Sequence, residues 1–115
     1  EAGGGIEAGG GIKAGGSIKA GGSIEAGWSI EAGGSIKAGG GIKAGWSIKA
    51  GWGIKAEWSI KAGGGIEAGW SIEAGGDYGI YAGISIRLSL KSIYAIIKSK
   101  TKPKNIILGE WMEIV

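Results

Sequence analysis

An isoleucine recurs at every sixth position from Ile6 to Ile72 without a miss. Around it, residues 1–78 form thirteen hexads with one template: a charged residue, Ala, Gly, Gly or Trp, Gly or Ser, and Ile. The thirteenth hexad departs from it and ends in Asp77 and Tyr78. A six-residue period is too short for a pair of helices. Most hexads contain two or three glycines. At a cost of roughly 1 kcal/mol each, these glycines also exclude a helix through the array. The period therefore predicts a coil of stacked β-strands.

Alternation within the hexad predicts which side chains face the core. In a strand, Ile and Ala point to one face, while Ser and the charged residue point to the other. The Gly-Gly or Gly-Trp pair is then the corner, where we expect glycine to supply a positive φ and to let successive corners stack closely. Only Glu57 interrupts the column of first corner glycines.

Two coil sizes remain open, because the period does not say how many hexads complete one coil. Stacking at twelve residues places opposite charges over one another in eight of eleven steps, against six of ten at eighteen. A coil of twelve residues also aligns Trp46, Trp58 and Trp70. A coil of eighteen residues instead stacks Trp28 with Trp46 and Trp52 with Trp70. We favour a two-sided coil of twelve residues, with a triangular coil of eighteen as the alternative.

The hexads stop near Asp77, and residues 79–115 lack the repeat. Residues 84–91 alternate between aliphatic and polar side chains, and further apolar runs cover 93–97, 106–108 and 110–115. A basic loop, 98–104, separates two of these runs. The whole chain is therefore predicted as one all-β domain: a solenoid over 1–78 and a β-rich C-terminal cap over 79–115.

Composition argues against an enzyme. The chain has no His and no Cys, so it lacks the most common general base, the thiol nucleophile and the usual zinc ligands. The Glu and Lys columns are regular, which is typical of solvated salt ladders. The glycine-rich stretches are not followed by a helix that could bind phosphate. We expect no catalytic residue, cofactor or metal, and no membrane span, because the apolar runs are short.

Two groups of residues are candidates for interaction. The corner tryptophans form an aromatic strip if they point outward, suited to self-association or a foreign ligand, and fill space if they point inward. The basic cluster creates a positive field that could attract phosphate, or is a solvated loop. Nucleic acid is not expected, since no aromatic residue lies within the cluster. The candidates are Trp28, Trp46, Trp52, Trp58, Trp70, Lys98, Lys100, Lys102 and Lys104.

In period and core residue, the Ile-Lys-Ala-Gly-Gly-Ser units and their variants over 1–78 resemble hexapeptide-type β-solenoids. These include the left-handed hexapeptide acyltransferases and the polymer-forming bactofilins. The acyltransferases use a catalytic His, which this chain lacks, so the resemblance does not carry their activity. The bactofilins imply non-enzymatic, head-to-tail polymerisation through solenoid ends.

We therefore expect a non-catalytic structural module that forms homo-oligomers or fibres through a solenoid end or the tryptophan strip. The alternative is a small inhibitor or adaptor, of the kind phages use against host systems, which binds one protein target through a flat face. The repeat is already in phase at Glu1, and we expect either processing of the start or further residues upstream.

Overall fold

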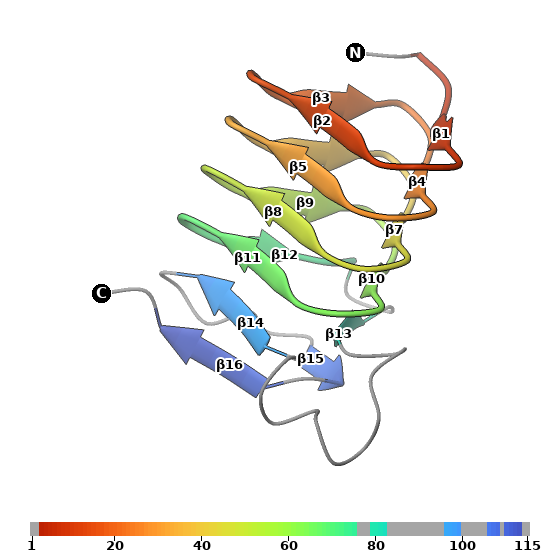
Figure 1. Ribbon diagram of the computed structural model, residues 1–115. Helices are drawn as coiled ribbons and strands as arrows, with labels where there is room; N and C mark the ends of the chain where they lie inside the picture. The colour runs from red at the N-terminus through yellow and green to blue at the C-terminus, as the bar shows by residue number, and fades with distance from the viewer. Residues whose placement is uncertain (1–2, 76–78, 83–95, 100–105, 109, 114–115) are drawn as a thin grey trace.

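The computed structural model describes residues 3–75, 79–82, 96–99, 106–108 and 110–113, and these residues form a three-sided parallel β-solenoid. Figure 1 shows the coils stacked along one axis, with the first coil at the top and the C-terminal strands at the bottom. The chain is all-β in its described part, as predicted, and every described strand pair is parallel.

Each side of the solenoid is one sheet, which we name A, B or C. Sheet B comprises β1 (Ile6–Ala8), β4 (Ile24–Ala26), β7 (Ile42–Ala44), β10 (Ile60–Ala62), β13 (Ile80–Ala82) and β15 (Ile106–Leu108). Sheet C comprises β2 (Ile12–Ala14), β5 (Ile30–Ala32), β8 (Ile48–Ala50), β11 (Ile66–Ala68), β14 (Ile96–Ser99) and β16 (Glu110–Glu113). Sheet A comprises β3 (Ile18–Ala20), β6 (Ile36–Ala38), β9 (Ile54–Ala56) and β12 (Ile72–Glu73).

The coil contains eighteen residues, so the preference for a two-sided coil of twelve was wrong and the triangular alternative is correct. Ile6 pairs with Ile24, and Ile24 with Ile42, so each hexad stacks on the third hexad along the chain. The charge count misled because exposed ion pairs contribute only about 0–1 kcal/mol each. Such small terms do not outweigh the packing of the core.

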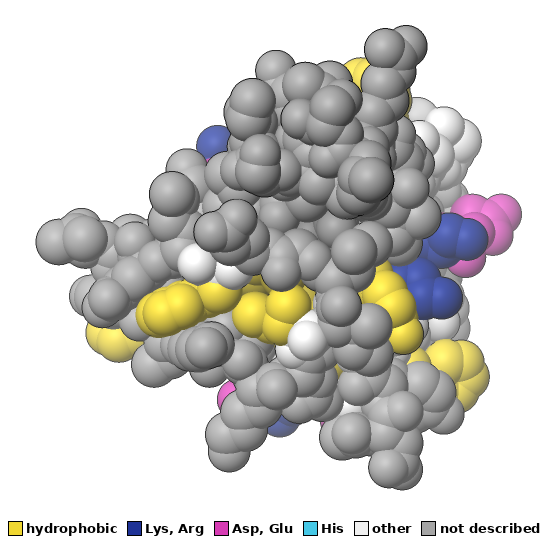
Figure 2. Space-filling model, turned by 90° about the horizontal axis from the view of Figure 1, so that it is seen from below, with side chains coloured by type: hydrophobic (Ala, Val, Ile, Leu, Met, Phe, Trp, Pro, Cys, Tyr) yellow, Lys and Arg dark blue, Asp and Glu magenta, His cyan; other side chains and the backbone are white. Residues whose placement is uncertain are grey.

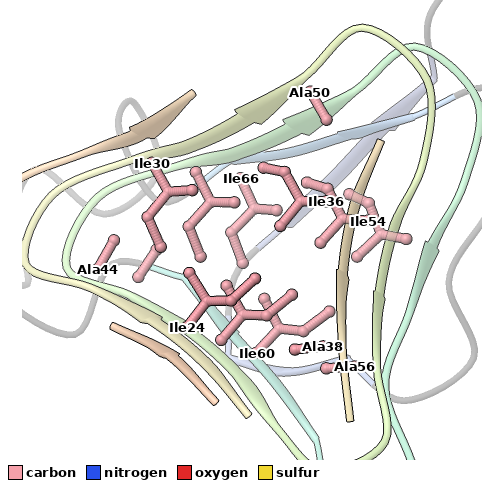
Figure 3. Close-up of a cluster of buried hydrophobic side chains, with 14 of the residues drawn as sticks. Ile24, Ile30, Ile36, Ala38, Ala44, Ala50, Ile54, Ala56, Ile60 and Ile66 are labelled. Carbon is pink, nitrogen blue, oxygen red and sulfur yellow. The ribbon is translucent and has the colours of Figure 1, made fainter. Parts of the chain in front are cut away.

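The core explains why three sides close well. In Figure 3 the isoleucines of the three sheets converge on the axis, and Ala38, Ala44, Ala50 and Ala56 lie toward the corners. From Ile24 to Ile72 every isoleucine of the array is at most 2% exposed. Three branched side chains per coil fill the centre of the triangle, and only a methyl group fits near a corner. The predicted alternation of buried Ile and Ala with an outward charged residue is confirmed.

The corner glycines are needed for close approach between coils. A Cβ on Gly33 would overlap the carbonyl oxygen of Gly15 in the preceding coil. A Cβ on Gly51 would overlap the carbonyl oxygen of Gly33 in the same way. None of these three residues has a positive φ, so that part of the prediction was wrong. Gly33 and Gly51 therefore require the absence of a side chain. Glu57 occupies the corresponding hexad position at another corner, between β9 and β10, where its N–H donates to the carbonyl oxygen of Ala38 at 3.2 Å.

Serines at the strand starts add bonds between coils. The N–H of Gly41 donates to Ser23 Oγ at 3.1 Å, and the N–H of Ser35 donates to Ser17 Oγ at the same distance. Both bonds join residues eighteen apart. They supplement a continuous backbone ladder, in which the N–H of Ile24 donates to the carbonyl of Gly41 at 2.9 Å.

Beyond the array, two of the three sheets continue. The strands β13 and β15 extend sheet B, and β14 and β16 extend sheet C, with Ile80 and Ile97 fully buried. Lys98 lies within β14, so the predicted loop 98–104 was wrong at its start. The strand predicted over 84–91, and most of the rest of that loop, lie outside the described residues.

Candidate interaction faces

Each regular strand of the array projects one charged side chain outward, and the eighteen-residue coil sorts these charges into three columns. Viewed from below in Figure 2, basic and acidic side chains lie at the periphery of the molecule, beside hydrophobic ones. The columns differ in sign from sheet to sheet, although the hexads that form them are nearly identical. The three faces therefore have different electrostatic character.

The face of sheet C alternates in sign. Its column runs through cross-strand neighbours of opposite charge: Lys13, Glu31, Lys49 and Glu67. The Lys13 Nζ lies 3.8 Å from Glu31 Oε1, with side chains 83% and 48% exposed. Such exposed pairs add little to folding stability. Their outward position leaves these charges accessible to another molecule.

The face of sheet A is mostly cationic. Lys19 pairs with Lys37, and Lys37 pairs with Lys55, before Glu73 ends the column. All four residues are exposed. Like charges opposite one another on neighbouring strands repel, so the lysine column of sheet A disfavours the stacking of its strands. The alternating column of sheet C favours the stacking of its strands.

The face of sheet B is divided into two blocks. Glu7 lies beside Glu25 in the first two coils, and Lys43 lies beside Lys61 in the next two. The Lys61 ammonium lies 5.5 Å from the centre of the Tyr81 ring, in a cation–π contact. That contact partly covers the last cation of the column, which is only half-exposed.

The first tryptophan pair lies at the corner between sheets B and C, which we call the B–C corner. The rings of Trp28 and Trp46 are stacked, with centroids 6.3 Å apart and planes at 20°. The N–H of Trp46 donates to the carbonyl oxygen of Trp28 at 2.8 Å. One coil before Trp28 the corresponding residue is Gly10, and one coil after Trp46 it is Gly64, against which the Trp46 ring packs. Trp28 remains 62% exposed.

The second pair lies at the next corner, between sheets C and A, which we call the C–A corner. Trp52 and Trp70 have ring centroids 6.0 Å apart and planes at 11°. The preceding coils carry Gly34 and Gly16 at this position. Trp58 lies at the remaining A–B corner. All five corner tryptophans are exposed, so the outward alternative of the sequence analysis is confirmed.

The basic cluster is only partly described. Lys98 pairs with Glu67 in the register of β14 against β11. Lys100, Lys102 and Lys104 lie outside the described residues. The structure therefore places Lys98 beside Glu67 in the register of sheet C, which sequence reasoning did not anticipate because it used the wrong coil size.

No three side chains among Asp, Glu, His and Cys gather closely enough to ligate a metal ion within the described ranges. Nor does the described part of the chain contain a helix of sufficient length and hydropathy to span a membrane. The shallow grooves that it does contain lie along the faces, such as the one over Glu7, Ala8, Glu25 and Lys43.

Comparison of the chain with protein-family models, curated proteins and solved structures finds no match. The likeness to hexapeptide solenoids is therefore a likeness of architecture, carried by the six-residue strand spacing and the parallel coils.

Proposed function

We propose that this chain is a non-catalytic structural module that self-associates through its flat outer faces. The observation that carries the proposal is the set of exposed, stacked tryptophans along two edges of one face. Exposed aromatic groups beside a polar surface are typical of protein interaction sites. Their stacking in pairs also reduces the side-chain entropy lost when a partner binds, because the rings are already ordered.

The repetitive surface supports an interaction role more than a catalytic one. Catalysis requires a few groups with distinct environments, whereas one coil of this array presents nearly the same side chains as the next. A surface that repeats at about 4.8 Å suits a partner with the same spacing. A second copy of the chain has that spacing, because it is built from the same coils.

Sedimentation velocity over a hundredfold range of protein concentration tests this proposal. A sedimentation coefficient that rises with concentration, to that of a dimer or larger species, supports self-association. A monomer at every concentration contradicts it, and would favour the alternative of an inhibitor or adaptor with a foreign protein target.

A further inference from the structure

We infer that sheet C is the self-association face, and that two copies bind through it with their solenoid axes antiparallel. This inference rests on the proposed function and adds the partner, the face and the orientation. It follows from the charge column and from the tryptophan and glycine positions at the two bordering corners.

The charges of sheet C are complementary in the antiparallel orientation. Two faces can be brought together by a two-fold axis that lies along the strands, which reverses the direction of one solenoid relative to the other. With the axis midway between Glu31 and Lys49, every opposed pair has opposite sign. The pairs are Lys13 with Glu67 of the partner subunit, Glu31 with Lys49 of the partner subunit, and the two symmetry-related pairs.

A parallel arrangement does not have this property. With the axis along the solenoid, residues at the same height face each other, so Lys13 meets its own copy and Glu31 does the same. Four like-charged contacts across an interface are strongly unfavourable. The alternating column therefore selects the antiparallel orientation.

The C–A corners of the two copies also have complementary shapes in this orientation. Reversal about the same axis sets Trp52 and Trp70 of one copy level with Gly34 and Gly16 of the other. Bulky side chains thus oppose positions without side chains, four times in each dimer. At the B–C corner, Trp28 and Trp46 exchange levels, so the two aromatic pairs of the dimer meet each other.

The other two faces fit less well. On sheet A the same operation sets Lys37 against Lys55 of the partner, a like-charged pair. Sheet B matches in charge, since its acidic block would meet a basic block. However, Lys61 is already engaged by Tyr81, and only three tryptophans border this sheet, compared with four for sheet C.

Charge-reversal variants test the inference on the whole chain. Lys13→Glu with Lys49→Glu makes the column of sheet C acidic, and Glu31→Lys with Glu67→Lys makes it basic. We expect each variant alone to dimerise at least about tenfold more weakly than the wild type, because like charges then oppose one another. An equimolar mixture should restore the dimer as a heterodimer, which shows that both variants are folded.

The matched control reverses two lysines of sheet A, Lys19→Glu with Lys55→Glu, which changes net charge by the same amount as the acidic variant. This control should dimerise like the wild type. If both sheet C variants also retain wild-type dimerisation, the inference is wrong, while the proposed function stands with another face. If the wild type is monomeric throughout, both fail.

Crosslinking tests the orientation independently, since the chain has no native cysteine. Packed sheets lie about 10 Å apart, a distance that a short bismaleimide can bridge. A mixture of Lys13→Cys and Glu67→Cys chains should give crosslinked dimers of one chain of each kind. Lys13→Cys alone should give few, because three coil spacings would separate its two sulfur atoms along the solenoid axis. The reverse result would show a parallel arrangement and overturn the inference.

Discussion

Sheets A and C are built from the same hexad, pack against the same core and each contain parallel strands, yet they present different charges to solvent. Sheet C alternates Lys13, Glu31 and Lys49, whereas sheet A stacks Lys19, Lys37 and Lys55. The difference arises because every third hexad falls on the same side of the coil. In a triangular solenoid, therefore, the order of charges along the chain assigns a separate electrostatic character to each face.

The largest effect on stability should come from substitutions in the core, where we expect sheets A and C to behave alike. Ile48 of sheet C and Ile54 of sheet A are both at most 1% exposed. We expect Ile48→Ala and Ile54→Ala each to lower the free energy of unfolding by about 2–5 kcal/mol, because each leaves a cavity. Urea denaturation measures both. Ile6→Ala, at a half-buried position, should lower the free energy of unfolding by less. Unequal losses for Ile48→Ala and Ile54→Ala would show that the cores of the two sheets are not equivalent.

The next largest effect should come from the corner that joins the two sheets. Gly33→Ala places a methyl group against the carbonyl oxygen of Gly15, and we expect a loss of about 1–3 kcal/mol in thermal or urea unfolding. The control is Gly15→Ala, in the same column one coil earlier, where a Cβ would meet nothing within 4 Å. Equal losses for the two variants would show that close approach is not the reason for the glycine.

A single substitution should make sheet A resemble sheet C. Lys37→Glu changes its column to the alternating order, which is self-complementary under the reversal proposed for sheet C. We expect a second association site, seen as species larger than a dimer in sedimentation velocity and weakened by 0.5 M salt, which screens exposed charges. Lys37→Gln, which removes the charge without reversing it, is the control. No larger species from Lys37→Glu would show that charge order alone is insufficient.

The smallest effects on stability should come from the removal of single exposed charges. Lys13→Ala removes the pair with Glu31, and we expect it to lower stability by less than about 0.5 kcal/mol, since the pair is exposed. Lys37→Ala removes a repulsive neighbour from sheet A and should change stability slightly in the opposite direction. Denaturation at low salt would reveal both differences. Effects of the same sign would count against the cross-strand interpretation.

Much of the fold could be predicted from the sequence. The placement of Ile and Ala inside and of charges outside followed from alternation, and the structure confirms it. The positive φ expected at the corners was wrong, because the glycines avoid overlap between coils without entering that region. The start of the loop at Lys98 was wrong too, since pairing of β14 with β11 extends a strand through a lysine that local composition assigns to a turn.

The interaction faces were harder to predict, because they depend on coil size. The tryptophans were identified as candidates, but their spacing fitted both coil sizes: three align at twelve residues, and two pairs form at eighteen. Stacking of Trp28 on Trp46 and of Trp52 on Trp70 was the better guide, since it involves large ordered rings. The charge count involved groups that water screens well.

By itself, the sequence determined the strand, its inward face and its corner, because these depend on neighbours within a single hexad. Only the tertiary structure decided that three hexads make a coil, since that depends on how branched side chains from different strands fill a common centre. The same closure decided which charges share a face and which tryptophans border it. Those relations join residues eighteen positions apart, where no local rule applies.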